Sequence, residues 1–147
     1  MEPAFGRSWN VPARAVALIR QSGARGNLAI DFDWGEYAVY HLSPAVKVSL
    51  DGRRETAYPR QAYLENLRFR FGQGDWDALL REHETHLALV RNGSPAFNLM
   101  KLMPGWVLIH EDPAAGLFGR EGLPAVEQIR RTPPPALPHD GAGLCFP

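Results

Sequence analysis

The sequence predicts an α/β fold, a Rossmann-like layered sandwich with a mainly parallel sheet and an antiparallel hairpin at one edge. Two observations support this prediction. Short apolar runs alternate with segments whose apolar residues recur every three to four positions, and parallel strands need helical crossovers of that kind between them. Two short runs near the end flank the turn sequence "EDPA", which is typical of a hairpin.

The individual elements follow from apolar spacing and from the residues that begin and end each run. Prolines lie at the expected starts of helices, and glycines or prolines follow their ends, as local backbone preferences require. The expected helices cover residues 12–22, 34–42, 58–71, 76–84, 95–103 and 122–131. The expected strands cover residues 27–32, 45–50, 86–92, 105–110 and 114–120.

These elements are expected to form a single domain over residues 8–131. Residues 132–147, "TPPPALPHDGAGLCFP", are rich in proline and glycine and have too little apolar periodicity to pack, so this tail is predicted to be disordered. The expected sheet core consists of Ile30, Val48, Leu50, Leu87, Leu89, Val107 and Leu108.

Composition argues against several functional classes. The 16 basic residues balance 16 acidic ones, whereas a nucleic-acid-binding protein needs a basic face. No apolar stretch approaches the ~20 residues of a membrane-spanning helix, and the first ten residues lack the layout of a signal peptide. The single Cys145 has no partner in the chain for a disulfide or a thiolate metal site. No P-loop, dinucleotide fingerprint, nucleophile motif or metal-ligand motif is present. The sequence therefore predicts no cofactor, no metal and no catalytic residue in this chain alone.

The segment "DFDWGEY" has a structural and a functional interpretation. Asp33 precedes a predicted helix and Glu36 follows three residues later, which is the spacing of a capping box. The functional interpretation rests on position, because ligands of open α/β sheets bind beyond the carboxyl ends of the strands. Polar side chains follow three predicted strands there. The candidate ligand-binding residues are Asp33, Trp34, Tyr37, Asp51, Arg53 and Arg91.

Carboxylates, a guanidinium and aromatic rings suit the hydroxyls and the apolar face of a sugar. A phosphate would be repelled by Asp33 and Glu36, so a carbohydrate is the expected ligand rather than an anion. In the alternative scaffold interpretation, Asp33 caps the helix and Arg53 neutralises Asp51 or Asp33. Asp31 and Asp33 also suggest the acid pair of a glycoside hydrolase, but nothing in the sequence builds the cleft that such a pair must flank.

The order of motifs from "DFDWGEYAVYHLSP" through "VKVSLDGRRETAYP", "GDWDALLREHETHLALV" and "PGWVLIHED" to "GLFGR" resembles a known type of domain. It is similar to the exposed C-terminal domain of bacterial multi-pass membrane proteins of the GT-C glycosyltransferase type. The likeness covers roughly residues 9–120, and Glu36 departs from the D-W-G-G-Y pattern of those domains. The matching positions are Asp33, Trp34, Gly35, Tyr37, Asp51, Gly52, Arg53, Tyr58, Trp76, Leu79, Leu80, Pro104, Gly105, Trp106, Glu111 and Asp112.

The resemblance implies a context. In GT-C enzymes the catalytic acid lies in the membrane helix bundle, so this chain would be an accessory domain on the extracytoplasmic face of a bacterial membrane. Its expected partners are that helix bundle and a sugar or lipid-linked sugar, with no nucleic acid. The alternatives are a free-standing interaction module and a small soluble carbohydrate-active enzyme, whose compartment the sequence does not specify.

Overall fold

The computed structural model describes residues 11–48, 60–82 and 84–133, which form a mixed α/β fold around one five-stranded open sheet. The strand order is β2-β1-β3-β5-β4. At the centre, β1 (Gly26–Ile30) pairs in parallel with β2 (Val46–Val48) and with β3 (Leu87–Arg91). The antiparallel strands β4 (Trp106–Glu111) and β5 (Ala115–Arg120) complete the sheet. The predicted α/β class, the parallel pairing and the edge hairpin are confirmed.

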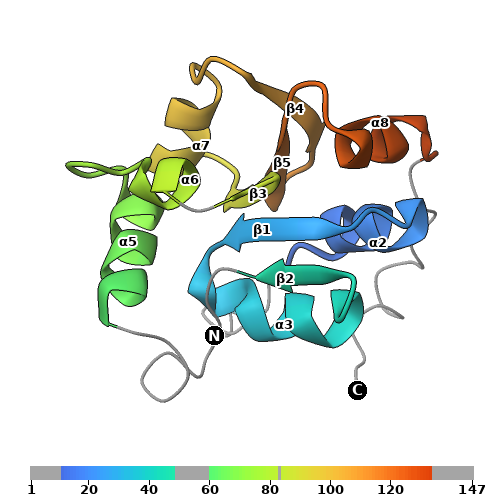
Figure 1. Cartoon of the computed structure of the whole chain (residues 1–147), viewed down its shortest axis with the longest axis horizontal. Helices are drawn as coiled ribbons and strands as arrows, with labels where there is room; N and C mark the ends of the chain where they lie inside the picture. Colours follow the sequence, from blue (N-terminus) through green and yellow to red (C-terminus); the bar gives the residue numbers. More distant parts are fainter. Residues whose placement is uncertain (1–10, 49–59, 83, 134–147) are drawn as a thin grey trace, which may run out of the picture.

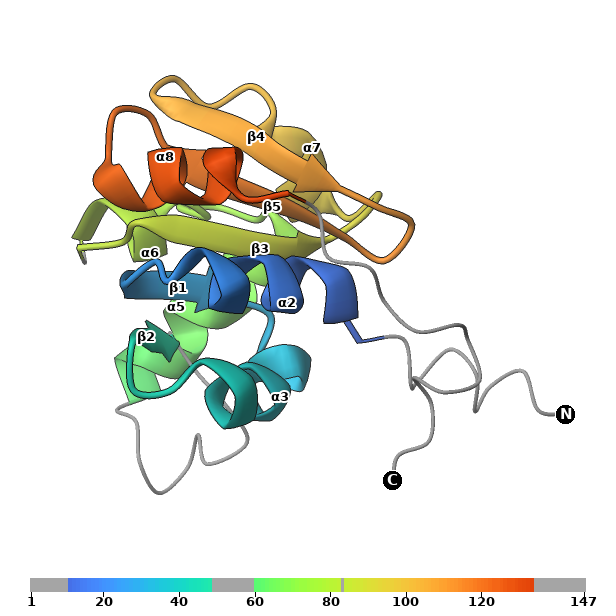
Figure 2. The ribbon, with the colours of Figure 1, turned by 90° about the vertical axis from the view of Figure 1, so that its right-hand side faces the viewer.

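Helices cover both faces of the sheet (Figure 1). On one face lie α2 (Ala13–Ser22), α3 (Phe32–Leu42) and α8 (Pro124–Arg131). Figure 2 shows α2 and α8 side by side on this face. On the other face lie α5 (Arg60–Phe71), α6 (Ala78–Glu82) and α7 (Pro95–Met100). The sheet therefore separates two apolar clusters.

The central strands supply both clusters because successive side chains of a strand point to opposite faces. In β3, Leu87 and Leu89 pack with α2, α3 and α8, whereas Ala88 and Val90 pack with α5, α6 and α7. All four are buried. Burial on both faces explains why this strand reads as a continuous apolar run.

Most of the predicted sheet core is found, with one error. Ile30, Leu87 and Leu89 are fully buried, and Val48 and Val107 pack at the margin of their cluster. Leu108 was predicted in the core, but it is 39% exposed. It lies opposite Phe118 on β4, and β4 has a neighbouring strand on only one side. Leu50 lies outside the described residues.

The apolar face expected of α5 is found only in part. Helical spacing places Tyr63, Leu64, Leu67 and Phe71 on one face of this helix. In the structure Leu64 and Leu67 are half-buried and Phe71 is 49% exposed, while the side chain of Tyr63 lies outside the described part. The fully buried side chains described on α5 are Phe69 and the polar Glu65 and Asn66. Both buried polar side chains have interaction partners, as burial of polar groups requires. Periodicity in apolar residues cannot reveal a helix face that is buried through polar contacts.

The limits of the domain remain predictions. Residues 1–10, 49–59, 83 and 134–147 lie outside the described part of the chain. The predicted domain start at residue 8 and almost all of the predicted disordered tail fall in these segments. The same holds for the candidate residues Asp51 and Arg53.

Candidate functional site

The candidate site lies where the direction of the strand crossovers reverses. Since β1 lies between β2 and β3, the chain leaves β1 toward one side and later returns to the other. Open α/β sheets bind ligands at such a switch point, outside the carboxyl ends of the strands. Here Asp31 directly follows β1 and Arg91 ends β3.

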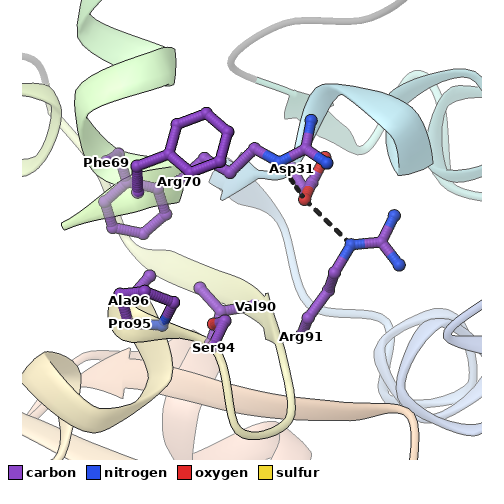
Figure 3. A pocket seen from close by; sticks show the side chains of 9 residues that line it. Asp31, Phe69, Arg70, Val90, Arg91, Ser94, Pro95 and Ala96 are labelled. Carbon is purple, nitrogen blue, oxygen red and sulfur yellow. Dashed lines mark hydrogen bonds and ion pairs between the residues drawn. The ribbon is translucent and has the colours of Figure 1, made fainter.

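A pocket of about 200 Å³ opens at this place (Figure 3). Its walls come from the end of α5, the end of β3 and the start of α7, and most of the lining is apolar. Polar groups enter from Asp31, two arginines and Ser94. The lining residues are Asp31, Phe69, Arg70, Phe71, Val90, Arg91, Ser94, Pro95 and Ala96.

Four charged side chains, Asp31, Asp33, Arg70 and Arg91, form a cluster along one side of the pocket. Oδ2 of Asp31 lies 3.3 Å from Nε of Arg70 and 3.0 Å from Nε of Arg91. Oδ2 of Asp33 lies 3.2 Å from Nη2 of Arg70 and 3.4 Å from Nη2 of Arg91. Each carboxylate therefore contacts both guanidinium groups, and the formal charges of this charge cluster cancel.

The start of α3 fixes both carboxylates, but their roles differ from the prediction. Asp31, not Asp33, is the N-cap: its backbone is extended, and Oδ1 accepts a hydrogen bond from the backbone N–H of Asp33 at 3.0 Å. Because the helix begins at Phe32, immediately after the cap, Asp33 lies inside the first turn. A carboxylate there is still favoured by the positive end of the helix dipole.

Arg91 is held from two sides. Its Nε donates to Asp31, and its guanidinium carbon lies 4.7 Å from the ring centroid of Trp34. Trp34 is only 2% exposed, so its ring supports Arg91 and offers no open face to a ligand. Tyr37, one turn further along α3, is half-buried with its ring 4.5 Å from that of His41. Burial raises the pKa of the Tyr37 hydroxyl.

The structure thus brings together three of the six candidate residues, Asp33, Trp34 and Arg91, and places Tyr37 on the next turn. The candidate ligand-binding residues did not include Asp31 and Arg70 of the charge cluster, or the rings of Phe69 and Phe71. An arginine in the last turn of a helix is common for local reasons, so Arg70 carried no distinguishing signal. Only the tertiary packing that places the end of α5 beside the carboxyl end of β1 brings Arg70 to Asp31.

Comparison of the chain with protein-family models, curated proteins and solved structures finds no match. Within residues 11–48, 60–82 and 84–133, no helix has the length and apolar character needed to cross a membrane. The same residues contain no group of three or more His, Cys, Asp or Glu side chains that could hold a metal ion.

Proposed function

We propose that this chain is an accessory extracytoplasmic domain of, or derived from, a membrane glycosyltransferase-like protein, and that its switch-point pocket contacts a carbohydrate or lipid-linked sugar. The observation that carries the binding proposal is the charge cluster beside an apolar pocket at the carboxyl ends of β1 and β3. The membrane context rests on the sequence resemblance.

The chemistry of the pocket supports a sugar ligand. Sugar rings combine an apolar C–H face with hydroxyl groups that both donate and accept hydrogen bonds. The half-exposed ring of Phe71 and the buried ring of Phe69 line the pocket and suit the C–H face. Carboxylate oxygens accept from hydroxyls and guanidinium groups donate to them, and both kinds of group border the pocket.

The arrangement favours binding over hydrolysis by this chain alone. Glycosidases place two carboxyl groups on either side of the scissile bond. Among the described residues, Asp31 is the one carboxylate that lines the pocket, and it is already engaged as a helix cap and as the partner of two arginines. The order β2-β1-β3 of the parallel strands is that of doubly wound folds, which supports the Rossmann-like prediction.

Chemical-shift perturbation in ¹⁵N-labelled protein tests the binding proposal. A panel of neutral sugars, nucleotide sugars and lipid-phosphate sugars should include a ligand that shifts the amides of Arg91 and Ser94. The variant Arg91→Gln should lose these shifts, whereas Arg81→Gln should keep them. Arg81 is a suitable control because it is an exposed arginine on α6, paired with Asp75 and Asp77 and outside the pocket. Absence of shifts with every sugar would refute carbohydrate binding.

The membrane context has its own test in the coding sequence that precedes Met1. Several long apolar spans there would support attachment to a membrane helix bundle. A coding sequence without such spans would favour a free-standing module or a small soluble enzyme.

A further inference from the structure

The two carboxylates of the charge cluster are held very differently. The side chain of Asp31 is 6% exposed, caps α3 and contacts the Nε atoms of both arginines. The side chain of Asp33 is 45% exposed, and a single oxygen, Oδ2, contacts the Nη2 atoms of both arginines. Asp31 is thus part of the framework, whereas Asp33 occupies the solvent side of the cluster.

Asp33 can leave the arginines without disturbing that framework. Exposed ion pairs contribute little to stability, and the Asp33 carboxylate would remain in the first turn of α3, where the helix dipole still favours it. The arginines would stay in place, since Asp31 holds both Nε atoms and Trp34 supports the guanidinium of Arg91.

The geometry left behind would suit an anion. Two Nη2 atoms already converge on one oxygen, which is how arginine pairs clamp carboxylates and phosphates. Without Asp33 the cluster has two positive charges and one negative charge, for a net charge of +1. Arg70 and Arg91 also line the apolar pocket, so a group attached to the bound anion can extend into it.

We infer that the ligand of this pocket is an anionic sugar, whose carboxylate or phosphate group replaces Asp33 between Arg70 and Arg91. This inference rests on the proposed carbohydrate binding and specifies its class. It revises the expectation that the acids of this segment repel an anion, because that expectation lacked Arg70. In the absence of ligand, Asp33 serves as an internal substitute for the ligand's anion.

The sign of the effect of Asp33→Asn distinguishes this inference from binding of a neutral sugar. Asparagine cannot compete as an anion, so glucose 1-phosphate or glucuronate should bind the variant roughly threefold or more tighter than the wild type, within the range of an exposed ion pair. If Asp33 instead accepts hydrogen bonds from the hydroxyls of a neutral sugar, the same substitution should weaken binding.

The experiment measures dissociation constants by NMR titration with glucose, glucose 1-phosphate, glucuronate and inorganic phosphate. The proteins are the wild type, Asp33→Asn, Arg70→Lys, Arg70→Gln and the control Arg81→Gln. We expect one or both anionic sugars to bind at least about tenfold tighter than glucose and at least about tenfold tighter than inorganic phosphate. A tenfold difference in dissociation constant is about what one charged contact contributes to binding. Arg70→Gln should remove this preference, and Arg70→Lys should retain only part of it because lysine lacks the planar fork. Comparison of glucose 1-phosphate with glucuronate shows whether the site prefers a phosphate or a carboxylate.

Each failure has a separate meaning. Equal binding of glucose and the anionic sugars, with weaker binding by Asp33→Asn, would overturn this inference and leave the proposed carbohydrate binding intact. Inorganic phosphate that binds as tightly as glucose 1-phosphate would also overturn it, because the sugar would then contribute nothing. If none of the four probes binds the wild type, the inference is overturned, and the wider sugar panel decides the proposed function. The test does not depend on the arginine variants being folded, since Asp33→Asn removes only the negative charge of an exposed side chain.

Discussion

Replacement of Asp31 by alanine should destabilise the protein far more than the same replacement of Asp33, although the two residues are two positions apart. Asp31 is 6% exposed and caps α3, and it also holds Arg70 and Arg91 by their Nε atoms. Asp33 is 45% exposed and caps nothing. The comparison therefore measures what the buried position of the charge cluster contributes to folding.

The expected magnitude follows from the contacts that are lost. Loss of an N-cap costs about 1 kcal/mol. Removal of one partner from a buried ion pair costs about 3–5 kcal/mol, but Arg70 and Arg91 are 27% and 35% exposed and keep Asp33, so about 1 kcal/mol for each arginine is a better figure. We thus expect Asp31→Ala to lower the free energy of unfolding by about 3 kcal/mol. Asp33→Ala should lower it by at most about 1 kcal/mol, because exposed pairs and dipole interactions are weak.

Asparagine separates the two contributions of Asp31. It caps helices about as well as aspartate but carries no charge, so Asp31→Asn should lower the free energy of unfolding by about 2 kcal/mol, which is the ion-pair part. The assay is urea unfolding at pH 7, followed by tryptophan fluorescence and far-ultraviolet circular dichroism. If Asp31→Ala costs no more than Asp33→Ala, the assignment of the cap and of the buried position is wrong. If Asp31→Asn is as stable as wild type, the ion pairs contribute nothing to folding.

Three further predictions concern other parts of the molecule. Gly116→Ala should destabilise the protein by about 1–3 kcal/mol, because the added Cβ would collide with the ring of Phe97. In a double-mutant cycle Phe97→Leu should relieve part of this cost, and strictly additive effects would contradict the clash. Ser94→Ala should lower the free energy of unfolding by about 1 kcal/mol, because the Ser94 hydroxyl accepts a hydrogen bond from the backbone N–H of Phe97 at the start of α7. Ser94→Asp should restore it, and equal stability of all three proteins would exclude the cap. Burial, with the charge of Arg20 as a smaller cause, lowers the pKa of His41 in the folded protein below the ordinary value of 6.5. As the pH falls below about 6.5, the His41 side chain therefore takes up a proton in the unfolded chain before it does so in the folded protein, and the folded protein becomes less stable. His41→Gln should therefore reduce the loss of stability between pH 7 and 5.5 measured by urea unfolding, and an unchanged or steeper loss would contradict the lowered pKa.

Several features follow from the sequence alone because they depend on neighbouring residues. Ser94 followed by Pro95 predicts a capped helix start, and the structure has both the cap and the proline in the first turn. Gly23 was expected to end the first helix, and it adopts the left-handed conformation that terminates α2. The apolar run at Leu87–Arg91 became a buried central strand, and the turn "EDPA" connects an antiparallel pair. Local backbone preference and side-chain period contain enough information for these assignments.

The candidate site depends on contacts between residues far apart in the sequence, and only the tertiary structure decided it. Arg70 and Arg91 are 39 and 60 positions from Asp31, counting from 31 to 70 and from 31 to 91, yet both form ion pairs with its carboxylate. The sequence offered two similar acids at the start of α3, and the choice of Asp31 as the cap depended on where β1 ends and the helix begins. Likewise, its position after a predicted strand made Trp34 a candidate surface for a ligand, whereas packing buried its ring beneath Arg91. A pattern within one element specifies that element, but which side chains meet at the edge of the sheet depends on how α3, α5 and β3 pack together.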